Sequence, residues 1–172
     1  ESILDNISFT LNPGDKTAII AQNDIQSTAL IRALMGDIDY EGTIKWGVTT
    51  SQSYLPKDNT NDFASGESIL EWIRQFANKE DDDNTFLRGF LGRMLFSGDE
   101  VNKSVSVLSG GEKVRVMLAK LMILKSNVLV LDDPTNHLDL ESISSLNDGL
   151  KDFKESIIFA SHDHEFIQTL AN

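Results

Sequence analysis

The 172-residue chain contains no cysteine, which excludes disulfide bonds and thiolate-based zinc sites. It also has no apolar run close to the ~20 residues that a membrane-spanning helix needs, and no signal-peptide pattern. Basic residues are few, since 15 Lys and Arg stand against 27 Asp and Glu, for a net charge of -12. Because phosphate backbones are bound by clustered cations, this charge argues against nucleic-acid binding by this part of the protein.

The rest of the composition is ordinary for a globular protein. Hydrophobic residues make up 40% of the chain, and the length suits one domain with a single core. The chain starts at Glu1, without an initiator Met, and stops at Asn172 after a helix-like run. We therefore expect an intracellular, acidic domain that is truncated at both ends and belongs to a longer protein.

Hydrophobic periodicity in the first part of the chain predicts alternating strands and a helix. Residues 3–11 alternate apolar and polar side chains, as a half-buried strand does, and 16–20 form a short β-branched run. Helical spacing from Thr28 is followed by Gly36, a residue suited to ending a helix. Residues 40–46 indicate a turn followed by a strand.

Two continuous apolar runs in the last part of the chain predict buried parallel strands. They are residues 127–131 and 156–160, and a helical pattern at 140–153 separates them. Each run ends in polar residues, the carboxylates 132–133 and the Ser-His-Asp sequence 161–163. A strand-helix-strand unit of this kind predicts an α/β fold with a mostly parallel sheet and a site at its carboxyl edge.

The middle of the chain has helical periodicity instead. Apolar residues follow helical spacing at 68–76 and 86–95, and Ser68 suits an N-cap. We therefore predict one domain in which residues of about 1–63 and 125–172 form the α/β core. A helical subdomain of about 64–124 is inserted into it.

The sequence Leu-Ser-Gly-Gly-Glu-Lys at 108–113, ahead of an apolar helical run, is the most specific stretch of the chain. Backbone N–H groups at a helix start attract phosphate, and paired glycines allow close approach. A plain Ser-Gly-Gly helix cap is the alternative for this stretch alone. The strand that ends in Asp132, 22 positions after Gly110, favours the functional interpretation.

The residues that end the two apolar runs suit metal and water chemistry. Asp132 can hold Mg²⁺ through water, and Asp133 can polarise an attacking water, although two Asp residues can also simply begin a loop. A lone His at a strand end is more often structural than functional. The Ser-His-Asp context of His162 favours a functional role.

These motifs together resemble those of ATP-binding-cassette (ABC) proteins. Residues 108–113 resemble the family's signature motif, 128–133 its Walker B strand, 134–139 its D-loop, and His162 its switch histidine. The D-loop sequence Pro-Thr-Asn-His-Leu-Asp is similar to that of the F subfamily, whose members are soluble and ribosome-associated and have two cassettes per chain. Further stretches resemble its second, C-terminal cassette, namely 92–97 and 140–143. The resemblance implies a P-loop NTPase fold of the ABC type.

What this resemblance implies for the site can be stated residue by residue. Asp133 and His162 are implied to be catalytic, and Thr28 and Asp132 to hold Mg²⁺. A larger set is implied to contact ATP: Asn23, Ser27, Thr28, Lys57, Ser109, Gly110, Gly111, Glu112 and Asp139. The implied partners are the other cassette of the same chain, and the ribosome and tRNA through parts outside this sequence. No membrane partner is implied, and the implied location is cytoplasmic.

The first motif of the family is degenerate here. An ATP-binding P-loop needs glycines whose N–H groups wrap the phosphates and a Lys that reaches them. The ungapped alignment of residues 21–30 puts Ser27 at the Lys position and Thr28 at the Mg²⁺-binding hydroxyl, and a shift by one puts Gln26 at the Lys position. Asp24 stands where a glycine belongs, and the β-branched Ile25 resists positive φ angles.

Two further positions depart from the family, and together the departures predict an impaired site. Lys57 stands at the position of the family's Q-loop Gln, and Asp133 replaces the usual Glu. In the family, each nucleotide lies between the P-loop of one cassette and the signature of the other. We therefore expect this cassette to lend its signature to its partner while binding ATP weakly itself. The alternatives are the ATPase subunit of a membrane transporter and an ATP-inert scaffold cassette.

Overall fold

The computed structural model describes residues 3–172 and divides them into two compact units. The first, which we call the core unit, contains residues 3–57, 126–136 and 150–172. The second, the helical unit, contains residues 58–125 and 137–149. The sequence places the helical segment at about 64–124, and the structure adds a second, later segment to the same unit.

The core unit is built on a four-stranded parallel sheet with the strand order β1-β4-β3-β2. The strands are β1 (Lys16–Ile19), β2 (Gln52–Leu55), β3 (Val128–Asp132) and β4 (Ser156–Ala160). β3 and β4 occupy the centre and are buried along their whole length, which agrees with their continuous apolar sequences. The predicted α/β fold with a parallel sheet is therefore confirmed.

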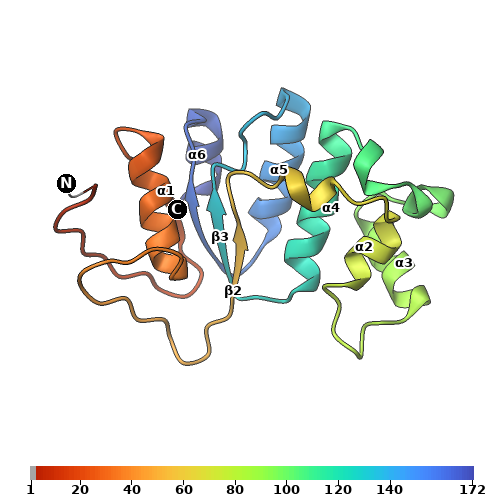
Figure 1. The fold of residues 1–172 in the computed structure, drawn as a ribbon, viewed down its shortest axis with the longest axis horizontal. Coiled ribbons are helices and arrows are strands. Elements are labelled where there is room, and N and C mark those ends of the chain that lie inside the picture. Colours follow the sequence, from red (N-terminus) through yellow and green to blue (C-terminus); the bar gives the residue numbers. More distant parts are fainter. Residues whose placement is uncertain (1–2) are drawn as a thin grey trace. The chain divides into compact units, whose positions relative to one another are not determined.

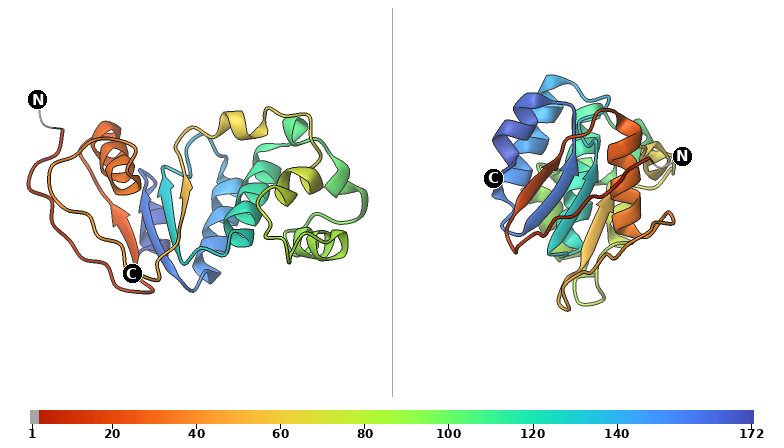
Figure 2. Two further views of the ribbon diagram at one scale, coloured as in Figure 1. Left: turned by 60° about the horizontal axis from the view of Figure 1, so that its bottom comes forward. Right: turned by 90° about the vertical axis from the view of Figure 1, so that its left-hand side faces the viewer.

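Helices cover both faces of this sheet, as the right-hand view of Figure 2 shows. On one face, α1 (Asp24–Met35) packs through Ile31 against Val130 and Ile158. On the other face, Phe166 of α6 (His164–Leu170) meets the Phe159 ring edge-on at 5.5 Å. Since successive side chains of β4 point to opposite faces, neighbouring residues of one strand serve both layers.

Three helices lie wholly within the helical unit, α2 (Ile69–Arg74), α3 (Asn84–Arg93) and α4 (Gly110–Ile123), and Figure 1 labels them. Short 3-10 turns accompany them at Thr60–Phe63, Gly98–Asn102 and Val105–Val107. α5 (Leu140–Asp152) belongs to this unit up to residue 149 and to the core unit after it. Within residues 3–172, no helix has the length and apolar content needed to cross a bilayer.

The local signals for helix ends are confirmed. Gly36 ends α1 in the left-handed conformation at φ 78°. Ser68 begins α2 with a capping box, in which its hydroxyl accepts the Glu71 N–H while the Glu71 carboxylate accepts the Ser68 N–H. Helix α1 begins at Asp24, one turn before the predicted start, because the Asn23 side chain caps it.

Two predicted strands are wrong, and one strand was missed. Residues 3–11 and 43–46 form no strand, because alternating side chains alone do not supply a neighbouring strand with which to pair. Trp46 instead packs on the core and donates its indole N–H to the Leu34 carbonyl. The missed strand, β2, has polar residues, and its buried Ser53 hydroxyl pairs with that of Ser126 at 2.6 Å.

Candidate functional site

The loop between β1 and α1 forms a helix cap. The Asn23 side chain accepts the Gln26 N–H at 3.1 Å, and the Gln26 side chain accepts the Gln22 N–H at 3.3 Å. No residue of the loop has a positive φ, the conformation with which phosphate-binding loops turn successive N–H groups inward. The N–H groups of Gln22 and Gln26 therefore bind side chains of the loop itself. In a P-loop, such N–H groups bind phosphate.

Ser27, which stands at the position of the P-loop lysine, is buried and faces the backbone. Its hydroxyl donates to the Asp24 carbonyl at 3.1 Å, and the residue is 6% exposed. The side chain therefore supplies no cation and makes a bond inside its own helix.

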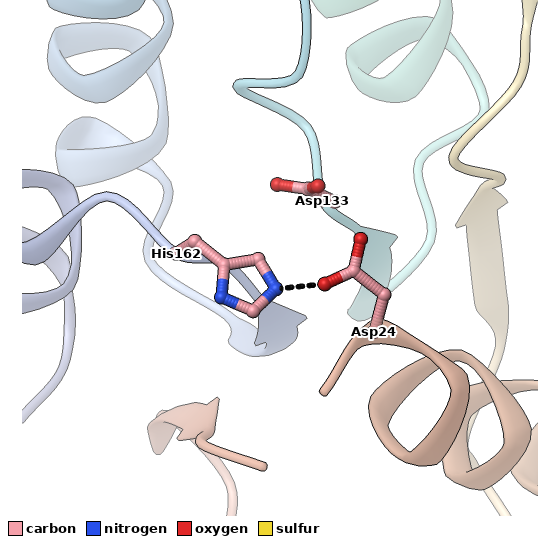
Figure 3. Close-up of side chains that lie close together, drawn as sticks. All are labelled: Asp24, Asp133 and His162. Atoms are coloured by element: carbon pink, nitrogen blue, oxygen red, sulfur yellow. Dashed lines mark ion pairs between the residues drawn. The ribbon is translucent and has the colours of Figure 1, made fainter. Parts of the chain in front are cut away.

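The Asp24 carboxylate lies at the centre of a charged cluster, which we call the Asp24 cluster: Asp24, Lys57, Asp133 and His162. One carboxylate oxygen, Oδ1, pairs with His162 Nε2 at 2.5 Å, as Figure 3 shows, and the other pairs with Lys57 Nζ. Lys57 Nζ also lies 3.2 Å from Asp133 Oδ2. The four contributing segments meet here because the carboxyl ends of β2, β3 and β4 and the N-terminus of α1 share one edge of the sheet.

Within the Asp24 cluster, Asp24 and Lys57 each favour the charged form of the other. The hydrogen bond from Lys57 is the main cause that lowers the pKa of Asp24, and the same bond is the main cause that raises the pKa of Lys57. As the first residue of α1, Asp24 also lies at the positive end of the helix dipole. Lys57, His162 and the N-terminus of α1, which would attract an anion at this edge of the sheet, therefore already contact the Asp24 carboxylate.

Thr28 and Asp132 lie together as the resemblance implies. The Thr28 hydroxyl donates to Asp132 Oδ1 at 3.1 Å, and Asp132 is 2% exposed. Burial raises the pKa of Asp132, while the hydrogen bond from Thr28 opposes that rise. Two hard oxygen donors at this spacing fit Mg²⁺, which takes few protein ligands and keeps several waters.

A second group of potential metal ligands overlaps with the Asp24 cluster. Atoms of Asp24, Asp133 and His162 lie within 4.8 Å of one another. The Lys57 ammonium group, however, binds both carboxylates, so a cation of the chain itself already neutralises them. Asp133 is therefore tied to a lysine, whereas a residue that polarises water needs a free carboxylate.

The start of α4 in the helical unit has the properties of an anion site. The Ser109 hydroxyl accepts the Glu112 N–H at 3.3 Å, and the Glu112 carboxylate accepts the Ser109 N–H at 2.8 Å. Lys103 binds the same carboxylate at 2.5 Å and is the main cause that lowers the pKa of Glu112 to about 2. The next two N–H groups, of Gly110 and Gly111, have no acceptor within residues 3–172 and point out of a helix start.

Asp139 caps the start of α5. Its carboxylate accepts the Ser142 N–H at 2.8 Å, and its carbonyl accepts the Ile143 N–H at 3.0 Å. The Ser142 hydroxyl and N–H together lower the pKa of Asp139. In this chain Asp139 therefore has a structural role, whatever ligand it also contacts.

The residues predicted for the site fall into two groups. The core unit holds Asn23, Ser27, Thr28, Lys57, Asp132, Asp133 and His162, and the helical unit holds Ser109, Gly110, Gly111, Glu112 and Asp139. Sequence reasoning identified Asp24 as an obstacle to phosphate but missed that it binds Lys57 and His162. The opposite charges of these residues were visible in the sequence, whereas their contact joins positions 33 or more residues apart.

Comparison with known proteins identifies the family. The family described as ABC transporter matches residues 4–136. The Bacillus subtilis (strain 168) protein named uncharacterized ABC transporter ATP-binding protein YkpA is 54% identical over 172 residues, which cover 99% of this chain and 32% of the relative. ABC transporter F family member 5 of Arabidopsis thaliana is 32% identical over 170 residues, covering 96% of this chain and 24% of the relative.

A solved structure shares the fold at low sequence identity. It is described as an inward-facing metal-chelate type ABC transporter, and it matches with a TM-score of 0.77 at 21% identity, covering 96% of this chain and 70% of that one. The chain spans about a third or less of the length of the two curated relatives. The family match over most of the residues, and the parallel sheet with its helical unit, lead to one conclusion: the chain belongs to the ABC transporter family, as an ATPase domain with the P-loop NTPase fold.

Proposed function

We propose that this chain is one cassette of a two-cassette ATPase of the F subfamily, and that it contributes more to ATP bound by the partner cassette than to ATP at its own site. It supplies the signature at the start of α4 to ATP held by the other cassette, while its own site binds ATP weakly and hydrolyses little. The observation that carries the proposal is the Asp24 carboxylate, held by Lys57 and His162 at the N-terminus of α1.

The contrast between the two helix starts supports this division of labour. A phosphate binds a helix N-terminus through free N–H groups and nearby cations. At α1 the cation Lys57 and the imidazole of His162 are engaged by Asp24, so a phosphate has to displace a carboxylate that is covalently part of the site. At α4 the N–H groups of Gly110 and Gly111 are free.

Relatives and motifs support the placement in the F subfamily. One relative at 32% identity is named as an F family member, and residues 134–139 have the sequence Pro-Thr-Asn-His-Leu-Asp, which resembles the D-loop of that subfamily. The partners proposed on this basis are the second cassette of the same chain, and the ribosome and tRNA through parts outside this sequence. The place of action proposed with them is the cytoplasm, and the cofactors are ATP and Mg²⁺.

The proposal is tested with Ser109→Ala in the full-length protein. We expect at least a tenfold loss of ATPase activity, because one donor next to the terminal phosphate of the partner's ATP is lost. Ser68→Ala is the matched control, since it removes an equivalent capping box from α2 of the same unit without touching the signature. If Ser68→Ala lowers the activity as much, the loss comes from helix stability.

Asp133→Asn in the full-length protein tests the other half of the proposal. We expect its turnover to stay within about twofold of the wild type, because Lys57 already engages this carboxylate and its site contributes little hydrolysis. A loss comparable to that of Ser109→Ala would contradict the impaired site. If neither variant changes turnover, the cassette is an inert scaffold, and co-purification with a membrane protein would favour a transporter subunit.

A further inference from the structure

Ser142, which the functional assignments above leave out, is a buried residue with an unusual hydroxyl. It lies in the first turn of α5 and is 1% exposed. Its N–H donates to Asp139, and its Oγ lies near enough to the same carboxylate to lower the pKa of Asp139. Within residues 3–172, however, the Oγ makes no hydrogen bond of acceptable geometry. Because buried hydroxyls are almost always hydrogen-bonded, an unpartnered one asks for an explanation.

The Ser142 hydroxyl faces the start of α4. A Cβ added to Gly111 would lie 3.5 Å from Ser142 Oγ, and one added to Gly110 would lie 3.8 Å from it. Cβ atoms of a helix tilt toward its N-terminus. The space that a Cβ of Gly110 or Gly111 would fill therefore borders the N-terminal end of α4. The hydroxyl is therefore aimed at the first turn of α4, where two N–H groups are free.

We propose that Ser142 is the third donor of an anion site formed with the N–H groups of Gly110 and Gly111. Its ligand is the terminal phosphate of a nucleoside triphosphate held by another cassette, so the inference rests on the function proposed above. Three converging donors match the three oxygens of a terminal phosphate better than the two N–H groups alone. The unpartnered hydroxyl is then explained as a group whose acceptor arrives with the ligand.

The neighbours of Ser142 are arranged to hold it in place. Asp139 fixes the Ser142 backbone through its N–H, and a hydroxyl rotates without moving the backbone. Glu112, the other carboxylate at this helix start, is bound by Lys103 and by the Ser109 N–H. Each carboxylate beside the site thus has a donor of its own.

The test is equilibrium binding to the full-length protein, measured by calorimetry with a non-hydrolysable ATP analogue and, separately, with ADP, both with Mg²⁺. We expect Ser142→Ala to weaken binding of the triphosphate analogue about tenfold and to leave ADP binding unchanged, because ADP lacks the terminal phosphate. Ser142→Cys, which keeps the shape of the side chain at a slightly larger size but is a weak donor, is expected to behave like Ser142→Ala. Ser145→Ala, an exposed serine of the same helix, is the control.

Three outcomes would overturn the inference. They are unchanged binding of the analogue in both Ser142 variants, an equal loss for ADP, and a loss in Ser142→Ala that Ser142→Cys does not share, which would indicate packing. The proposed function fails separately, if Ser109→Ala leaves ATPase activity unchanged. If Ser109→Ala lowers the activity while the Ser142 variants bind normally, only the role of Ser142 is wrong.

Discussion

Asp24 shows how one residue can change what a site accepts. In a phosphate-binding loop its position calls for a glycine, which adds no charge and permits any φ. Here the carboxylate faces a lysine and a histidine, one on each oxygen. Asp24 and Lys57 both differ from the residues that the family has at these positions, and we interpret them as one pair. Each neutralises the charge that the other brings to this edge of the sheet.

A single substitution at the lysine position is predicted to be insufficient. Ser27→Lys in the full-length protein should not create a second ATP site, because Asp24 and Ile25 remain and the loop keeps its internal hydrogen bonds. Combining it with Asp24→Gly, Ile25→Gly and Gln26→Gly removes the competing carboxylate and the β-branched side chain, and frees the Gln22 N–H. We expect binding only in the combined variant, measured by titration with Mg-ATP. Binding by Ser27→Lys alone would show that the backbone was already competent.

Among the elements, α4 depends on its capping box more than α2 does. Both helices begin with Ser and have Glu three residues later, but only Glu112 also binds a lysine, Lys103. This second partner is the main reason why the pKa of Glu112 falls from 4.5 to about 2. A carboxylate with a lowered pKa stabilises the folded state above its unfolded pKa.

The stability of the protein should therefore depend on pH through Glu112. Its contribution, at most about 3 kcal/mol from the difference between the two pKa values, is fully present above about pH 4.5 and lost progressively as the pH falls through about 2. Urea unfolding of the wild type and Glu112→Gln should differ most at pH 7 and little near pH 2. Glu71→Gln in α2 is the control and should have a smaller effect at pH 7. Equal effects of both variants at pH 7 would contradict the role of Lys103.

The elements that could be predicted from sequence are those whose signal is local. β3 and β4 are continuous apolar runs because they are buried on both faces, and the caps of α2 and α4 lie within four residues. β2 could not be predicted, because its buried Ser53 is explained only by a hydroxyl 73 residues away. Residues 3–11 have the right alternation for a strand, but pairing depends on a partner that the pattern does not specify.

The candidate site divides in the same way. Thr28, Asp132 and the α4 start follow from motifs, and the structure places Thr28 beside Asp132. The Asp24–His162 contact joins residues from α1 and the end of β4, so charge alone did not predict it. Ser142 belongs to the stretch 140–143 that resembles the F subfamily, but no sequence pattern indicated that its hydroxyl faces Gly110 and Gly111.

For the whole molecule, we propose unequal roles for the two nucleotide sites of a two-cassette protein. This chain spans about a third of the length of its relative YkpA, and its net charge of -12 argues against nucleic-acid binding by this part of the protein. The contribution to the ATPase that we propose for this chain is the anion site at the start of α4. Its own site holds a carboxylate of the chain in place of a phosphate.

The most direct test of this account is the number of ATP molecules that the full-length protein binds, measured by calorimetric titration with Mg²⁺ and a non-hydrolysable ATP analogue. We expect one tight site per full-length chain, which is weakened by Ser109→Ala and unaffected by Asp133→Asn. Two sites of equal affinity per chain would contradict it.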